Sequence, residues 1–278
     1  MKCTKISLAL LVLCCNVTKN VQCMENPDLK LNPFVNVNVE RLIKESQLLN
    51  GTGTRAKIYT NNNYPDKVIK HYENSSGKDC DEAYPARQLM GDDVPKSLMK
   101  CYGVLNGNTI IYERINGKTL KEWFYDKKDN EKIPFDFFCQ HWVLEMFEGM
   151  KYFANHVTFT GTKNFFGGIR YNFINKPCLP NDLNADNIML RYSNDSKYPT
   201  PVKIDHGVFD YFATDTLMNL AGYLKDVMDT KVKYNSDQEL KFKQLRSFLA
   251  LGGKSKSDAP KHWFSANETL KELKKILN

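Results

Sequence analysis

Three polar residues in the segment PNDLNADNIML (residues 180–190) lie next to an apolar run, where they could do chemistry. Asp182 and Asn187 are five residues apart, and Ile188 begins an apolar stretch typical of a buried strand. Carboxylate and amide oxygens held at strand ends are ligands that a hard cation such as Mg²⁺ prefers. A polar surface turn that enters a strand, with Asp186 as an ordinary surface residue, would also produce this pattern.

Two other segments carry charged residues at the ends of apolar strands. Asp205 follows the strand of VKIDHG, and Lys70 ends the strand of KVIK. A lone strand lysine often only extends to solvent. However, Glu82 lies twelve residues after Lys70, with Ala86 and Leu89 on one face of a predicted helix, so it could hold Lys70 as an ion pair. Together these residues predict a site for metal-bound phosphates.

A glycine-rich segment, GTGTRAKIY (residues 51–59), precedes these residues in the chain. Gly51 and Gly53 lack a side chain beyond hydrogen, so the backbone of a strand–turn–strand can approach a phosphate chain closely with its amide groups. Ala56 occupies a third small position. Glycine-rich hairpins without a ligand are common, so this segment indicates phosphate binding only because it precedes Lys70.

The elements that must position these residues begin with strands. RAKIYT and DKVIKHY alternate as strands do, and the turn-like NNNYP separates them. A hairpin is predicted over residues 97–115, where Asn106-Gly107 is a strong tight-turn dipeptide. Between these strands, CDEAYPARQLM (residues 80–90) is a short helix candidate that Pro85 weakens.

In the second half of the chain the apolar spacing is helical. The stretch 136–156 has one apolar stripe at three- and four-residue spacing, which core packing explains without any function. Residues 214–229 and 267–278 predict further helices, and LGGKSKSDAP (residues 251–260) predicts a loop. Strands followed by helices indicate an α+β fold. The stripe consists of Phe138, Trp142, Met146, Met150 and Phe153.

In this order, the four segments resemble the protein-kinase-like superfamily, from about Glu45 to Met228. GTGTRAKIY resembles G-x-G-x-x-G-x-V, and KVIK resembles V-A-I-K. PNDLNADNIML resembles H-R-D-L-x-x-x-x-N-I-x-L, and KIDHG resembles the strand that leads into D-F-G. The resemblance implies a two-lobed fold with a small β-rich N-lobe (residues 45–115), a helical C-lobe (residues 116–278) and a shortened activation segment. It also implies a hinge at Glu113-Arg114-Ile115, after the gatekeeper-like Tyr112.

The same resemblance implies a site for ATP with one or two Mg²⁺ or Mn²⁺ ions. Lys70, paired to Glu82, would contact the α- and β-phosphates, while Asp182 would accept or orient the proton of the acceptor hydroxyl. Asn187 and Asp205 would hold the metal ions. Phosphoryl transfer needs positioning and charge neutralisation more than covalent help, so these residue types suit it. The implied nucleotide-binding residues are Gly51, Gly53, Ala56, Lys70, Glu82, Glu113 and Ile115.

The implied activity is transfer of the γ-phosphate of ATP to a hydroxyl, and a protein Ser/Thr hydroxyl is the acceptor expected first. Small-molecule kinases of the aminoglycoside- and choline-phosphorylating kind use the same core and are one alternative. A pseudokinase, a binding module without transfer activity, is the other. Retention of all five polar residues argues against a pseudokinase. These residues are Lys70, Glu82, Asp182, Asn187 and Asp205.

Four departures limit the resemblance. Pro180-Asn181 replaces His-Arg, which removes a scaffold contact and the usual receptor for an activating phosphate. His206 stands where Phe is usual and is expected to pack on the N-lobe helix. About eight residues follow Gly207 before the predicted central C-lobe helix, which leaves no room for a peptide platform. Residues 158–178 are an insertion expected either to line a substrate pocket or to form a loop packed on the C-lobe.

Residues 1–23 are expected to be a secretory signal peptide. Lys2 and Lys5 precede the apolar run 6–15, and VQC provides a tolerable cleavage site. The run is shorter than the ~20 apolar residues of a membrane-spanning helix, and a membrane anchor or a buried N-terminal helix is the alternative. We therefore expect a mature protein that is secreted or held in the secretory lumen. It would begin with an irregular lead-in, residues 24–44.

The charge of the chain bears on its partners. The 278 residues carry a formal net charge of +7. Removal of the signal peptide leaves about +4, which is too mild and too scattered to indicate nucleic acid. The expected partners are therefore a nucleotide and a protein or small-molecule hydroxyl acceptor, without stable membrane insertion.

Cysteines and sequons fit a secretory route. Four cysteines remain after the signal peptide, so up to two disulfides are expected in an oxidising compartment, and a bridge from Cys139 to Cys178 would tie down the insertion. A glycan at Asn50 would interfere with nucleotide access, so that sequon is expected to be unused. The four cysteines are Cys80, Cys101, Cys139 and Cys178, and the sequons begin at Asn50, Asn74, Asn194 and Asn267.

Overall fold

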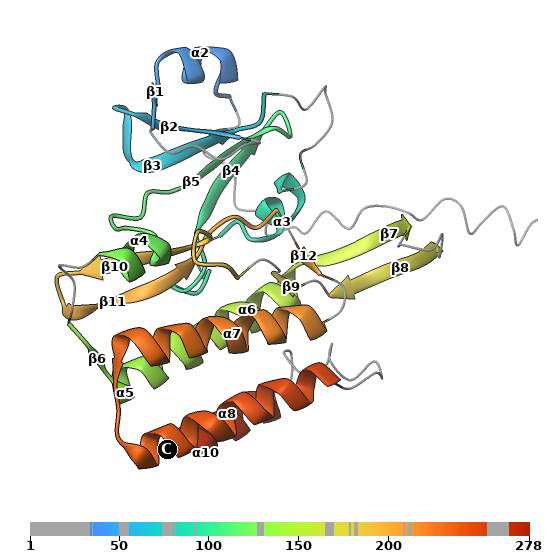
Figure 1. Cartoon of the computed structure of the whole chain (residues 1–278). Coiled ribbons are helices and arrows are strands. Elements are labelled where there is room, and N and C mark those ends of the chain that lie inside the picture. The colour runs from blue at the N-terminus through green and yellow to red at the C-terminus, as the bar shows by residue number, and fades with distance from the viewer. Residues whose placement is uncertain are drawn as a thin grey trace, which may run out of the picture. The chain divides into compact units, whose positions relative to one another are not determined.

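The computed structural model of the chain describes Phe34 and most later residues. The fold is α+β, as the sequence predicts, with an antiparallel sheet and several helices (Figure 1). The predicted signal peptide, residues 1–23, lies outside the described residues. Among the described residues, no helix is both long and apolar enough to cross a membrane. The described residues are Phe34, 36–49, 56–73, Cys80, 82–91, 93–126, 131–164, 170–177, 179–180, 183–207, 209–210, 213–254 and 267–278.

The largest sheet has five strands, and all of its neighbouring pairs are antiparallel. The order is β1-β2-β3-β5-β4. Asn106 and Gly107 turn the β4–β5 hairpin with φ angles of 49° and 69°, positive values that Asn and Gly adopt most easily. The predicted β2–β3 and β4–β5 pairs are confirmed. The strands are β1 (Gln47–Leu48), β2 (Lys57–Asn61), β3 (Tyr64–His71), β4 (Cys101–Leu105) and β5 (Thr109–Glu113).

A short helix, α2 (Val39–Lys44), precedes the sheet. The side-chain oxygen of Asn38 accepts the N–H of Arg41 at 2.9 Å, which caps the helix. Leu42 is buried in a cluster that includes side chains of β2 and β3. The prediction of an irregular lead-in over residues 24–44 is therefore wrong for its last six residues. The cap and this burial together stabilise a helix there.

The predicted helix after residue 80 is present as α3 (Ala83–Gln88). Pro85 lies in its first turn, where the missing N–H would have no partner in the helix. Ala83 and Ala86 are fully buried, and the helix packs against β4 and β5. The small alanine side chains hold the start of the helix close to the sheet, so Glu82 faces inward.

The longest helical stretch coincides with the predicted apolar stripe. All five residues of the stripe are at most 1% exposed, so core packing accounts for them. A capping box between Thr119 and Glu122 begins the preceding helix. The elements here are α4 (Leu120–Tyr125), α5 (Phe135–Phe137), the π-helical segment η1 (Phe138–Leu144) and α6 (Glu145–His156).

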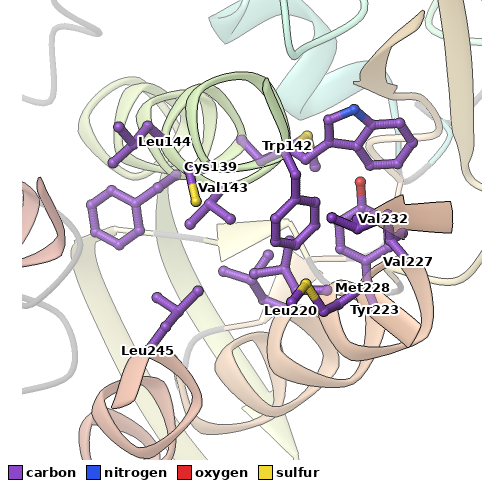
Figure 2. Packing of buried hydrophobic residues seen from close by; sticks show 14 of the residues in the cluster. Cys139, Trp142, Val143, Leu144, Leu220, Tyr223, Val227, Met228, Val232 and Leu245 are labelled. Atoms are coloured by element: carbon purple, nitrogen blue, oxygen red, sulfur yellow. The ribbon is translucent and has the colours of Figure 1, made fainter. Parts of the chain in front are cut away.

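Three more helices of the described part of the chain belong to the helical core. Figure 2 shows Cys139, Trp142 and Val143 among side chains from α7 and α8. α7 packs against α8, and α8 against α10. The sequence did not predict α8, and the loop predicted over residues 251–260 is wrong for its first four residues. Buried residues at helical spacing mark α8, namely Phe242, Leu245 and Leu249. The bounds are α7 (Ala213–Lys231), α8 (Ser236–Lys254) and α10 (Asn267–Leu277).

Two antiparallel hairpins follow α6. β7 (Thr158–Asn164) and β8 (Arg170–Pro177) form the first, so the predicted loop over the insertion is wrong. Its proposed role in lining a pocket stays a prediction. β10 (Ile188–Ser193) and β11 (Ser196–Lys203) form the second, and they contain the strands predicted from Ile188 onward and in VKIDHG. Two-residue strands pair as β6 (Ile133–Pro134) with β13 (Val232–Lys233) and β9 (Leu179–Pro180) with β12 (Phe209–Asp210).

The described cysteines are free thiols. Cys80, Cys101 and Cys139 are all buried, and burial raises the pKa of Cys101 and of Cys139 to about 12. Cys139 packs in the helical core, whereas Cys80 and Cys101 pack in a separate cluster with Tyr112. The expectation of disulfides is therefore wrong for these three residues, including the bridge from Cys139. Cys178 lies outside the described residues.

Candidate functional site

The pairing of β3 with β5 places several side chains of the site on one face of the sheet. Side chains two residues apart in a strand share a face, so Val68, Lys70 and Tyr72 point the same way. Val68 lies directly opposite Tyr112 in β5. Because residues opposite one another in an antiparallel pair also share a face, Tyr112 joins this group.

Glu82, just before α3, is completely buried, and four donors converge on its carboxylate. Lys70 Nζ lies 2.5 Å from Oε2, and the Tyr72 hydroxyl donates to the same oxygen at 2.5 Å. The Tyr112 hydroxyl donates to Oε1 at 2.7 Å, and the backbone N–H of His206 donates to it at 3.1 Å. The Lys70–Glu82 ion pair expected from the sequence is present, together with two tyrosine hydroxyls that the sequence did not predict.

The carboxylates around Lys70 control its protonation. Burial alone would lower the pKa of Lys70, but the charges of Glu82 and Asp205 outweigh burial and raise it. Burial first, and then the charge of Glu82, raise the pKa values of Tyr72 and Tyr112 well above the usual value. At neutral pH the site therefore contains a charged lysine and two neutral phenols around one buried carboxylate.

Asp205 follows β11 with a φ of 56°, in the left-handed region. This region costs a residue with a side chain roughly 1–2 kcal/mol, so the surrounding contacts must hold it there. Its Oδ1 lies 3.2 Å from Lys70 Nζ and accepts the N–H of Gly207 at 3.3 Å. Burial acts to raise the pKa of Asp205, but Lys70 and Lys203 outweigh burial and lower it. The carboxylate is therefore ionised at neutral pH, and with its side chain 39% exposed it can reach a ligand.

Asn187 and Asp205 meet because of the β10–β11 register. Ile188 begins β10 opposite Lys203, which ends β11, and the N–H of Ile204 donates to the carbonyl of Asn187 at 2.9 Å. The two predicted metal ligands thus flank the open end of one hairpin. Carboxylate and amide oxygens suit Mg²⁺ or Mn²⁺. Within the described residues, no cluster of three or more His, Cys, Asp or Glu forms a metal centre by itself.

The structure describes some of the other predicted site residues but not all of them. Ala56 and Ile115 are buried, at 8% exposure each. The Glu113 carboxylate lies 2.7 Å from Arg191 and accepts the N–H of Lys100, so it is already engaged. Gly51, Gly53 and Asp182 lie outside the described residues, and their roles stay predictions.

Sequence reasoning missed some of the residues that surround Lys70. Tyr72 could have been found, because strand alternation places it on the same face as Lys70. Val68, Met189 and Ile204 are partly buried apolar side chains that pack against the cluster containing Tyr112. They come from three separate strands or strand ends, so only the tertiary fold brings them together.

His206 is packed rather than exposed. Its ring is fully buried, lies 6.2 Å from the Tyr112 ring and 5.9 Å from the Phe153 ring, and has Nε2 at 3.3 Å from the Met99 carbonyl. Within the described part of the chain, Nδ1 has no hydrogen-bond partner. Burial, and then the charge of Lys203, lower the pKa of His206 to about 4. His206 is therefore buried by packing, as expected, but its aromatic contacts lie on β5 and α6, and its backbone N–H is the group that reaches Glu82, just before α3.

This depressed pKa predicts acid destabilisation. The unfolded chain binds a proton at His206 near pH 6.5, whereas the folded chain does so only near pH 4. Stability is therefore full above pH 6.5 and falls as pH drops to 4, by about 3 kcal/mol from this residue. Urea unfolding between pH 4 and 7 measures the loss. His206→Phe, similar in size and uncharged, should flatten that slope, and an unchanged slope would contradict the assignment.

Comparison with known proteins identifies no relative of this chain, so the site is interpreted from its own geometry. No protein-family model matches the chain, and no curated protein matches its sequence.

Proposed function

We propose that this chain is a phosphotransferase of the protein-kinase-like type, which moves the γ-phosphate of ATP to a hydroxyl group. The observation that carries the proposal is the placement of Lys70 at 2.5 Å from the Glu82 carboxylate and 3.2 Å from the Asp205 carboxylate. A lysine fixed in this way presents a steady positive charge to phosphate oxygens. The five-stranded sheet would belong to the N-lobe (residues 45–115), and the main helices to the C-lobe (residues 116–278).

Each residue has a distinct task in this proposal. Lys70 orients the α- and β-phosphates, and Glu82 fixes Lys70. Asp182 accepts or orients the proton of the acceptor hydroxyl. Asn187 and Asp205 hold Mg²⁺ or Mn²⁺, and the bound metal would neutralise charge on the phosphates. The remaining nucleotide contacts would come from Gly51, Gly53, Ala56, Glu113 and Ile115.

The acceptor proposed first is a protein Ser/Thr hydroxyl, and a small molecule is the second candidate. Two observations favour the small molecule. α7 begins at Ala213, six positions after Gly207, which leaves little chain for a peptide platform. A pocket of about 360 Å³ also lies beside Leu183, the residue after Asp182, and this volume suits a small ligand. α4, residues 183–185 and α7 line this pocket.

The proposed setting is outside the cytosol. Residues 1–23 would direct the chain into the secretory pathway and then be removed, which leaves residues 24–278 as the mature protein. Buried free thiols are compatible with that route, because thiols buried with a raised pKa react slowly.

The test uses residues 24–278 with γ-labelled ATP and Mg²⁺ or Mn²⁺. Acceptors are a Ser/Thr peptide library in one arm, and aminoglycosides and choline in the other. Wild type should transfer label in one arm, and Asp205→Ala and Asp182→Ala should each lower the rate by about 100-fold or more. Asp195→Ala, in the exposed β10–β11 turn, is the matched control and should keep the rate.

The outcomes separate the candidates. Label on peptides supports a protein kinase, and label on aminoglycosides or choline supports a small-molecule kinase. If wild type neither binds nucleotide nor transfers phosphate, and the two variants behave like it, the enzymatic proposal is wrong.

A further inference from the structure

Lys203 is a completely buried lysine at the end of β11, two residues before Asp205. Its Nζ donates to the backbone carbonyls of Ile204 and Asp205, at 2.8 Å for the latter. Lysine is rarely buried completely, because moving its charge out of water is costly. The contacts of the Lys203 ammonium group must therefore offset the cost of burying its charge.

The contacts of Lys203 lie on the turn that carries Asp205. That turn has the left-handed φ of 56°, which directs the Asp205 carboxylate toward Lys70 and the Gly207 N–H. Two successive carbonyl oxygens on the inner side of the turn point at one ammonium group. A charged donor binds carbonyl oxygens more strongly than a neutral one, so it can hold a backbone conformation that is unfavourable by itself.

The backbone of Lys203 is also held by hydrogen bonds. Its N–H donates to the Ser97 carbonyl at 2.8 Å, and its carbonyl accepts the N–H of Met99 at 3.0 Å. It also lies opposite Ile188 in the β10–β11 pair. The lysine therefore joins the turn to the hairpin that ends at Asn187, the other predicted metal ligand.

We propose that Lys203 is a positioning residue, whose ammonium group holds the Asp205 turn so that the Asp205 carboxylate is set for metal binding beside Asn187. This inference rests on the proposed function, because it gives the carboxylate a metal to bind. It adds a residue that the motif resemblance does not assign. Lys203 itself touches neither nucleotide nor acceptor in this proposal, and it acts through the geometry of Asp205.

The test measures the Mg²⁺ concentration that gives half-maximal transfer at saturating ATP. Lys203→Met keeps side-chain length but removes the donor, and it should raise this concentration about 10- to 100-fold, as loss of a residue that orients a metal ligand does. ATP binding measured in EDTA should stay at the wild-type value. Lys203→Arg, which keeps charged donors, should restore part of the Mg²⁺ response. The matched control is Lys231→Met, a buried lysine whose ammonium lies over the Trp123 ring instead, and its Mg²⁺ response should stay unchanged.

The outcomes distinguish this inference from the function beneath it. A Lys203→Met protein that transfers phosphate with the wild-type Mg²⁺ dependence overturns the inference, even if its thermal stability is lower, and the proposed function stands. If Lys203→Met does not fold, Lys203→Arg is compared with Lys203→Gln. The arginine variant should reach half-maximal transfer at a lower Mg²⁺ concentration than the glutamine variant. Equal concentrations would overturn the inference. Wild type that neither binds nucleotide nor transfers phosphate overturns both proposals.

Discussion

Replacing Glu82 with leucine should lower the free energy of unfolding by about 3–5 kcal/mol, the range for breaking a buried ion pair from one side. Among the described residues, the substitution would leave the Lys70 ammonium with the Asp205 carboxylate, at 3.2 Å, as its remaining ion-pair partner. It would also remove the Glu82 acceptor from the half-buried Tyr72 hydroxyl and from the buried Tyr112 hydroxyl. Leucine fills most of the volume, so the loss comes mainly from the lost ion pair and hydrogen bonds rather than from a cavity.

Urea unfolding followed by tryptophan fluorescence measures this loss. The matched control is Glu73→Leu, the same substitution at a glutamate whose pair with Lys57 is exposed to solvent. Exposed pairs contribute little, so the control should unfold close to wild type. Similar losses in the two variants would mean that the network around Glu82 does not stabilise the fold.

Replacing Lys70 with methionine should lower the rate of phosphate transfer by about 100- to 1,000-fold, the effect of removing one fixed positive or hydrogen-bonding group from a transition state. Its stability loss should be smaller than that of Glu82→Leu. Glu82 would still accept from the two tyrosine hydroxyls and from the N–H of His206. The initial rate at saturating ATP and Mg²⁺ is the measurement for activity, and Lys67→Met, three positions earlier in β3, is its control.

Combining the two substitutions sharpens the test. A Lys70→Met/Glu82→Leu protein removes both charges together, so its loss of stability should be clearly less than the sum of the single losses. Strict additivity would show that the 2.5 Å contact between the two side chains contributes no coupling energy.

Several parts of the fold and site could be predicted from sequence because they depend on local signals. The Asn106-Gly107 turn, the alternation in β3 and the apolar stripe from Phe138 to Phe153 all occur where the sequence places them. The Lys70–Glu82 pair was also predicted, since a glutamate at the start of a helix that packs on the sheet can reach a lysine on the face that the helix covers. Each of these inferences needed only a short stretch of chain.

The parts that failed depend on tertiary contacts or on weak local signals. Tyr72 and Tyr112, whose hydroxyls donate to Glu82, lie 10 and 30 positions from it in the sequence. Only the β3–β5 register brings Tyr112 beside Lys70. The buried Lys203 resembles any polar strand end until its carbonyl contacts are known. α8 escaped prediction because Gly252 and Gly253 lie in its last turn, where glycine normally indicates a loop.

The β10–β11 hairpin has one further consequence, for sugar attachment. Asn187 and Asp205 flank its open end, whereas Asn194 lies in the exposed turn that closes it. Six strand residues separate these ends, which corresponds to roughly 20 Å of extended chain. A glycan on Asn194 would therefore extend into solvent away from the two proposed metal ligands, and we expect that this sequon can be occupied without obstructing the proposed nucleotide site.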